Sequence, residues 1–306
     1  MRTTFRKLLP LVLCATASAE IRIAVNATTI ESAPIFLAER TPNVKIVPVP
    51  NGRAAMAQLL EGSVDAATGS ETQALLNSTT QPEMRIIMTL SEASYRIIGR
   101  KSAGIRRVGD LRGKKVAATV NTSSQYFLRE MLRTEGLRES DVQFVSLEGP
   151  AMPAALKRGD VDAVAIWEPH AQNSVEALGS DAVDLRNPSV YRERFNLNTT
   201  ARVLRDPSKR KELVGFLKEV LRASDRIRGQ RRQSIVFLAP SINTSEQTIG
   251  RVWNQFRFPA NLPDDLPRVL VGVETYVAAV QNRPPRTPAI LRSLIDTGPL
   301  NEARLR

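Results

Sequence analysis

Cysteine and histidine are nearly absent from this chain of 306 residues, which has one of each, Cys14 and His170. Neither a Gly-x-Ser-x-Gly phrase nor a glycine-rich phosphate loop is present. These absences weaken the case for an enzyme. We expect His170, which follows Pro169, to be a surface or hinge residue.

Residues 1–19 are typical of a cleavable secretory signal. A basic start precedes a short apolar run from Leu8 to Cys14 and the small-residue cleavage site Ala17-Ser18-Ala19. That run is well short of the roughly 20 residues of a membrane-spanning helix, and no later stretch comes close. We therefore expect a soluble protein, periplasmic or secreted, that begins at Glu20. Without Cys14, disulfides and thiolate metal sites are excluded.

The charge balance is basic, with 43 Lys and Arg residues against 31 Asp and Glu residues and a formal net charge of +12. The basic residues are scattered, and the densest run, 226–232, has a helical pattern without interleaved aromatic residues. Single-stranded nucleic acid binding would favour such aromatics. We expect no nucleic-acid partner and a field that mildly attracts anions.

A repeated phrase divides the chain into two similar halves. Gly-x-Val-Asp-Ala occurs at 62–66 and again at 159–163, each time after a predicted short helix and before a predicted strand. Strands that alternate with helices indicate mainly parallel sheets. The sequence predicts an α/β protein with two lobes and a ligand cleft between them, with lobe 1 formed by 20–111 plus 199–306 and lobe 2 by 112–198.

Hydrophobic periodicity and turn residues predict the individual elements. The predicted strands are 21–25, 44–49, 64–68, 85–88, 95–99, 115–120, 142–145, 163–166 and 199–204. The predicted helices are 34–39, 53–61, 127–134, 207–225, 248–256 and 267–281.

Three phrases together resemble a known family. They are Asp110-Leu111-Arg112-Gly113-Lys114-Lys115-Val116, the turn 121–124 before Tyr126-Phe127-Leu128, and Val161-Asp162-Ala163 leading to Trp167-Glu168-Pro169. The chain resembles the periplasmic substrate-binding proteins of ABC importers, in the branch of sulfonate, taurine and nitrate binders that also includes thiamine-pyrimidine synthase-like proteins. The resemblance implies a two-lobe, type II periplasmic-binding-protein fold with helices on both faces of each sheet, a small-molecule ligand and an ABC permease as partner. We expect a monomer without a cofactor.

Polar residues at the carboxyl ends of the predicted strands are the candidate ligand contacts, because ligands of open parallel sheets bind there and helix N-termini favour anions. The candidates are Thr28, Thr29, Ser32, Ser70, Glu71, Asn121, Thr122, Ser123, Ser124, Trp167, Glu168 and Asn198. Helix capping is the alternative for the hydroxyl residues, a helix-start or salt-bridge role for the two glutamates, and a core position for Trp167.

These observations predict an extracytoplasmic solute-binding protein. It would capture a small anionic or heteroaromatic solute, sulfonate-like, nitrate-like or pyrimidine-like, by hinge closure and deliver it to an ABC importer. A secreted ligand-sensing or interaction protein is one alternative. A pyrimidine-synthase-like enzyme is another, although the chain matches neither the cysteine-rich iron site nor the histidine-containing pyridoxal phosphate pocket of those relatives.

Overall fold

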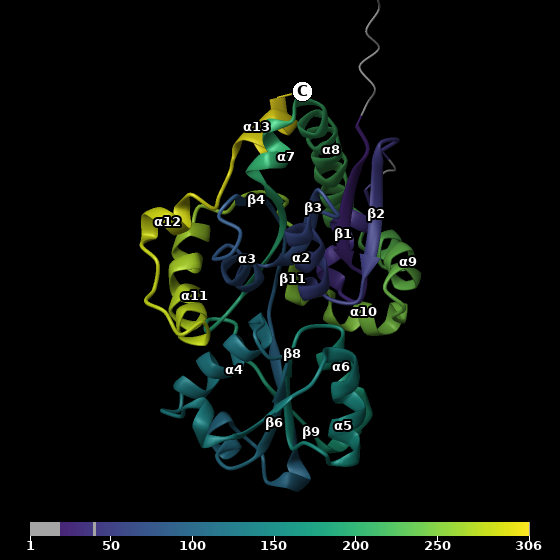
Figure 1. Cartoon of the computed structure of the whole chain (residues 1–306). Coiled ribbons are helices and arrows are strands. Elements are labelled where there is room, and N and C mark those ends of the chain that lie inside the picture. Colours follow the sequence, from purple (N-terminus) through teal and green to yellow (C-terminus); the bar gives the residue numbers. More distant parts are fainter. Residues whose placement is uncertain (1–18, 39–40, 306) are drawn as a thin grey trace, which may run out of the picture.

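The computed structural model describes residues 19–38 and 41–305, and it has two lobes joined by strands that run between them (Figure 1). The predicted signal at 1–19 lies outside the described residues except for Ala19. Within the described part of the chain, no helix combines the length and apolar character needed to cross a bilayer.

The first lobe is built on a six-stranded sheet in the order β11-β4-β10-β3-β1-β2. Strand β1 pairs in parallel with β2 and β3, whereas β10 is antiparallel to both β3 and β4, and β11 is antiparallel to β4. The bounds are β1 (Ile21–Asn26), β2 (Val44–Val49), β3 (Ala66–Ser70), β4 (Met84–Ala93), β10 (Glu193–Thr200) and β11 (Phe256–Arg257).

The second lobe is built on a five-stranded sheet in the order β7-β6-β8-β5-β9. Strand β6 is parallel to β7 and β8, and β5 is antiparallel to β8 and β9. The bounds are β5 (Arg96–Arg100), β6 (Lys115–Ala118), β7 (Gln143–Ser146), β8 (Ala163–Ile166) and β9 (Ala182–Leu185).

The expected α/β fold with mainly parallel sheets is confirmed. Strands β1 to β4 share one direction in the first sheet, and β6 to β9 share one direction in the second. Three strands are inverted: β5 and β10, each the first strand after the chain has changed lobes, and the short edge strand β11. Both changes of lobe therefore interrupt the parallel pattern.

The strands change sheets at positions that differ from the predicted lobe boundaries. The chain leaves the first sheet after Ala93 and enters the second at Arg96, not after residue 111, and it re-enters the first sheet at Glu193, not at residue 199. The strand predicted at 199–204 is also wrong beyond Thr200, whose side chain caps helix α7 (Ala201–Arg205). Side-chain alternation identifies a strand but does not say which sheet it joins.

Helices cover both faces of each sheet. In β1, Ile21 and Ile23 belong to the apolar cluster under α8, and Ala24 belongs to the cluster that contains Met56 of α2. Figure 1 places α4 on one side of the second sheet and α5 and α6 on the other. The helices are α1 (Ala33–Phe36), α2 (Gly52–Glu61), α3 (Glu71–Asn77), α4 (Ser123–Arg133), α5 (Met152–Arg158), α6 (His170–Leu178), α7, α8 (Pro207–Gly229), α9 (Arg231–Ser241), α10 (Glu246–Val252), α11 (Leu266–Val280), α12 (Pro288–Arg292) and α13 (Gly298–Leu305).

The repeated Gly-x-Val-Asp-Ala phrase forms the same joint in both lobes. Gly62 and Gly159 end α2 and α5 with φ of 74° and 80°, a left-handed conformation that favours glycine. The two aspartates then fix β1 in lobe 1 and β6 in lobe 2. Asp65 accepts a hydrogen bond from the Arg22 amide at 2.9 Å, and Asp162 accepts one from the Lys115 amide at 2.9 Å.

A buried ion pair stabilises the first crossover. Arg96 is 2% exposed, and its guanidinium lies 2.6 Å from the carboxylate of Glu168 and 2.7 Å from that of Asp184. Gln172 also accepts a hydrogen bond from Arg96, at 3.2 Å. The network ties the first strand of lobe 2 to the segment between β8 and α6.

Removing Arg96 alone should destabilise the protein strongly, because Glu168 would remain buried without its partner. We expect Arg96→Met to lower the free energy of unfolding by about 3–5 kcal/mol and the double variant Arg96→Met/Glu168→Gln to regain much of that loss. Arg158→Met, which breaks an exposed pair with Asp160, is the control and should change it by less than about 1 kcal/mol. Urea unfolding followed by circular dichroism measures all three, and a double variant no more stable than Arg96→Met would contradict this account.

Candidate functional site

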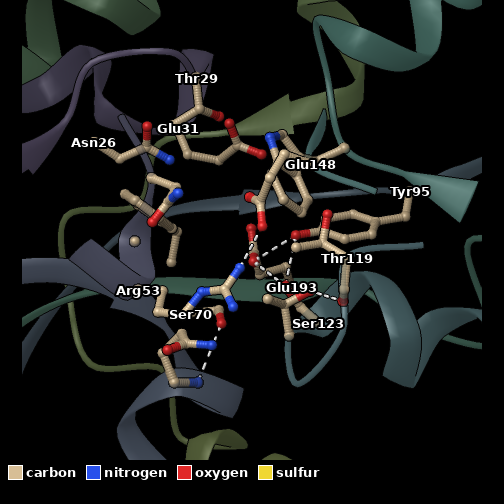
Figure 2. Close-up of a pocket in the computed structure, with 16 residues that line it drawn as sticks. Asn26, Thr29, Glu31, Arg53, Ser70, Tyr95, Thr119, Ser123, Glu148 and Glu193 are labelled. Atoms are coloured by element: carbon tan, nitrogen blue, oxygen red, sulfur yellow. Dashed lines mark hydrogen bonds and ion pairs between the residues drawn. The ribbon is translucent and has the colours of Figure 1, made fainter. Parts of the chain in front are cut away.

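A small cavity lies where the two lobes meet, and Figure 2 shows the side chains around it. The space open to the centre of a water molecule is about 40 Å³. Lobe 1 contributes Asn26, Thr29, Glu31, Asn51, Gly52, Arg53, Ser70, Gln73, Glu193 and Phe195 to its lining. Lobe 2 contributes Thr119, Thr122, Ser123, Glu148 and Trp167, and Tyr95 comes from the crossover between β4 and β5.

The fold places this cavity at the carboxyl ends of parallel strands in both lobes. Strand β1 ends at Asn26, β3 ends at Ser70, and Thr119 directly follows β6. The N-termini of α2, α3 and α4 lie at the same place, capped by Asn51, Ser70 and Thr122. This is the edge at which open α/β sheets bind ligands.

Contacts between the lobes close the cavity. At its rim, the guanidinium of Arg53 lies 2.5 Å from the carboxylate of Glu148. The Gln73 side chain donates to the Asn121 carbonyl at 2.8 Å, and the Thr29 hydroxyl donates to the Glu168 carbonyl at 3.4 Å. The structure therefore represents a form in which the lobes are in contact around the site.

Glu193, the first residue of β10, forms a hydrogen-bonded cluster with the other lobe and the crossover. Its Oε1 accepts from the Tyr95 hydroxyl at 2.6 Å and from the Ser123 hydroxyl at 2.9 Å, as the dashed lines in Figure 2 show. Burial raises the pKa of Glu193 to about 8, with a further contribution from the charge of Glu71.

Glu31 lies in the 3-10 helix Ile30–Ser32 that follows β1, and its side chain also lines the cavity. The residue is 1% exposed, and neither carboxylate oxygen has a hydrogen-bond partner among the described residues. Burial raises the pKa of Glu31 well above its ordinary value, and the negative charge of Glu193 adds to that rise, against a smaller opposing effect of the Glu31 backbone amide. Two buried carboxylates thus face one small cavity.

Five of the twelve predicted site residues line the cavity: Thr29, Ser70, Thr122, Ser123 and Trp167. Capping, the alternative for the hydroxyl residues, also applies to Ser70 and Thr122, which accept from the backbone amides of Gln73 and Ser124. Trp167 is 9% exposed, its ring centroid lies 6.0 Å from that of Tyr95, and its indole N–H has no partner among the described residues.

The other predicted residues lie outside the lining, and their polar groups hold the protein together. Glu168 pairs with Arg96, and Glu71 accepts from the Tyr191 hydroxyl and the Arg194 amide, so the salt-bridge or structural alternative applies to both. The remaining five make hydrogen bonds within the protein. Thr28 bonds to Asn26 and Pro50, and Ser32 bonds to Asn26. Asn121 bonds to Gln125, Ser124 to Ala165, and Asn198 to Ala67.

His170 was expected at the surface or at a hinge, and the surface placement is wrong. The residue is 6% exposed at the start of α6, and its ring centroid lies 6.2 Å from that of Trp167. A Cβ on Gly149 would lie 2.7 Å from the imidazole, so the glycine leaves the room that the ring occupies. Burial lowers the pKa of His170 to about 4 and keeps the ring neutral at pH 7.

Sequence reasoning missed the residues that give the cavity its charge: Glu31, Arg53, Glu148 and Glu193. Glu31 had a visible signal, because it lies in the polar turn after the first strand between two predicted residues, Thr29 and Ser32. Glu193 had none, because only the return of the chain from lobe 2 brings it to the cleft.

Comparison with known proteins identifies the family. The family model described as NMT1/THI5 like matches residues 36–222. The chain belongs to the NMT1/THI5-like family. A curated relative, the taurine-binding periplasmic protein of Escherichia coli strain K12, is 35% identical over 63 residues, which are 21% of this chain and 20% of that protein. The chain thus matches only a fifth of that relative's length.

Solved structures show the fold of this family member over almost the whole chain. The periplasmic aliphatic sulphonate binding protein of Escherichia coli superposes with a TM-score of 0.76 at 22% identity and covers 91% of this chain and 98% of its own. The periplasmic nitrate-binding protein of Synechocystis PCC 6803 gives a TM-score of 0.77 at 14% identity, with coverage of 94% and 88%. The predicted periplasmic-binding-protein fold is confirmed.

The raised pKa of Glu193 should make the ligand-free protein less stable as the pH rises. The folded state keeps a proton up to about pH 8 that the unfolded state loses near pH 4.5, so unfolding releases a proton between these values. We expect urea unfolding to show a free energy that falls from about pH 5 to about pH 8, by up to about 1.4 kcal/mol per unit.

Glu193→Gln should make this profile less steep, and the remaining slope would come from Glu31 and Glu71, whose pKa values are also raised by burial, that of Glu71 to about 7. Glu61→Gln on the exposed end of α2 should leave the profile unchanged. A wild-type stability that rises over the same interval would show that Glu193 is ionised in the folded protein at neutral pH.

Proposed function

We propose that this family member is an extracytoplasmic solute-binding protein that captures a small solute by closing its two lobes and delivers it to an ABC importer. The observation that carries the proposal is the cavity itself. It is small and lined by polar and aromatic side chains of both lobes, and residues from both lobes make the contacts that close it. A ligand that touches both lobes would favour the closed form in proportion to its differential affinity for that form.

The crossovers suit a hinge. The chain passes between the sheets at residues 94–95 and again between Leu185 and Glu193, so rotation about these two segments would separate the lobes without breaking either sheet. Tyr95 and Glu193, which belong to or adjoin these segments, also line the cavity. Ligand contact and hinge position are thus coupled through the same residues.

Among the predicted ligand classes, the lining favours the pyrimidine-like one. A sulfonate or nitrate offers only acceptor oxygens and a negative charge, whereas the interior of the cavity includes two buried glutamates, whose ionised form would repel an anion. A heteroaromatic ring offers N–H donors to those carboxylates and a flat face to Tyr95 and Trp167. The similar proteins named above carry sulfonate, taurine and nitrate in their names, so the family fold does not determine the ligand.

The periplasmic relatives and the signal-like N-terminus support an extracytoplasmic location. The periplasmic-binding-protein fold supports a membrane permease as the partner of a monomeric binding protein. The sensing alternative uses the same cleft and differs in its partner. The enzyme alternative would require reactive groups at the cavity, and His170, the only histidine of the chain, does not line it.

Ligand binding should stabilise and compact the protein. We expect one chemical class from a panel of alkanesulfonates, taurine, nitrate, pyrimidines and small ammonium compounds to raise the melting temperature, since ligand at about 1,000 times its Kd adds roughly 4 kcal/mol. Small-angle scattering should show a smaller radius of gyration with the same compound. Trp167→Ala/Ser123→Ala should fold but lose both responses. No response to any compound, in protein free of co-purified ligand, would contradict solute binding.

The Arg53–Glu148 pair should act as a latch. Both side chains are about half exposed, at 45% and 52%, so Arg53→Ala should change the free energy of unfolding by less than about 1 kcal/mol. Ligand dissociation, measured by stopped-flow fluorescence, should nevertheless become faster. Arg205→Ala, which breaks an exposed pair with Glu83 away from the cleft, is the matched control. Equal dissociation rates in both variants would exclude the latch.

A further inference from the structure

We propose that the solute held in this cavity is a compact organic cation with N–H donors, gripped by the carboxylates of Glu31 and Glu193, and not an anion. This inference rests on the proposed function, because it assumes that the cavity between the lobes is the solute site. It goes further by naming the chemical class of the solute and the two residues that select it.

The charges around the cavity are the first observation. Three carboxylates line it, those of Glu31, Glu148 and Glu193, against one cation, Arg53, among the described residues. Arg53 is engaged by Glu148 at the rim, with 2.5 Å between the charged atoms. The interior is therefore left with the acidic groups of Glu31 and Glu193, and an anion placed there would find no free guanidinium to pair with.

The state of Glu31 is the second and independent observation. A buried carboxylate is normally satisfied by hydrogen bonds, yet both oxygens of Glu31 lack a partner among the described residues while the residue is 1% exposed. In Figure 2 no dashed line reaches Glu31, whereas Glu193 is joined to two hydroxyls. The N–H groups of a bound cation would supply the bonds that Glu31 lacks.

Glu193 is placed to share that cation. Both of its hydrogen bonds, from Tyr95 and from Ser123, end on Oε1, which leaves Oε2 for a ligand. Glu31 comes from the segment after β1, and Glu193 begins the strand that returns from lobe 2. Both glutamates belong to lobe 1, but Glu193 also accepts from Ser123 of lobe 2, so a cation bound beside it would contact the cluster that joins the lobes and would thereby favour closure.

The rest of the lining favours an organic cation over a metal ion. Tyr95, Trp167 and Phe195 contribute aromatic rings, and an organic cation is attracted to aromatic faces. The indole N–H of Trp167 and the hydroxyl and amide side chains can also serve polar groups elsewhere on the ligand. The open space of about 40 Å³ limits the solute in this closed form to a small head group, such as a guanidinium, amidinium or primary ammonium.

Protonation provides a way to separate a cation from an anion. Burial raises the pKa values of both glutamates, so the empty site holds protons that a bound cation displaces. The charged and titratable groups near the pair are Tyr95, Tyr191, Glu71, Glu168 with its partner Arg96, and the rim pair Arg53 and Glu148. A cation should bind more tightly as the pH rises from about 6 to about 8, whereas an anion accepted by protonated carboxyls should bind more tightly as it falls.

The test compares three planar solutes of nearly identical shape and different charge: guanidinium, urea and nitrate. Each is titrated into the purified protein by calorimetry at constant ionic strength and low millimolar concentration, with tryptophan fluorescence as a second signal. We expect guanidinium to bind, with proton release and tighter binding at higher pH, and urea and nitrate not to bind. Glu31→Gln and Glu193→Gln should each weaken guanidinium binding by at least about tenfold. Glu61→Gln, on the exposed end of α2, should leave it unchanged.

Circular dichroism establishes that each variant is folded. Proton release is measured on the wild-type protein, so it tests the cation assignment even if a variant does not fold. Binding of nitrate in preference to guanidinium, or guanidinium binding that persists in Glu31→Gln, would overturn the cation assignment. A sulfonate or nitrate that raises the melting temperature while guanidinium does nothing would overturn it and leave solute capture intact. Failure of every solute in both panels would overturn solute capture as well.

Discussion

The hydrogen bonds that converge on Glu193 are the interaction on which the architecture of the cleft depends. They join the first residue of β10, the crossover residue Tyr95 and the N-terminus of α4, which belong to three separate parts of the chain. The hydrogen bonds among these three parts hold the two lobes together around the cavity. Because the meeting point is a glutamate, the same contact that positions the lobes also places an acidic group at the site.

The buried glutamates that would bind the ligand lower the stability of the ligand-free protein. Glu31 and Glu193 are both nearly inaccessible, and bringing a charged group out of water without a full set of partners is unfavourable. Apolar side chains at these two positions would avoid this cost, but they would offer no hydrogen-bonding groups to a ligand. Glu31 thus lacks hydrogen-bond partners in this structure, and the proposed ligand would supply them.

Other buried acidic residues in the molecule have partners. Glu168 is paired with Arg96, and Glu274 accepts from Arg283 and Arg286, so their burial is compensated inside the protein. Glu71 is held by the Tyr191 hydroxyl and the Arg194 amide. The contrast identifies Glu31 as different in kind. The fold supplies partners to Glu168, Glu274 and Glu71, whereas Glu31, which faces the cavity, has none among the described residues.

The sequence by itself determined the class of fold and the region of the site. The alternation of strands and helices, and the Gly-x-Val-Asp-Ala joint with its left-handed glycine and strand-fixing aspartate, act over short stretches of chain, so local pattern reveals them. For the same reason Thr29, Ser70, Thr122, Ser123 and Trp167, which lie at or just beyond strand ends, could be placed near the cavity. The lobe boundaries, the burial of His170 and the meeting of Glu31 with Glu193 were decided only by the tertiary structure. They arise from contacts between residues far apart in the chain. Hydrophobic periodicity does not show which strand another strand pairs with, or which distant residue a carboxylate meets.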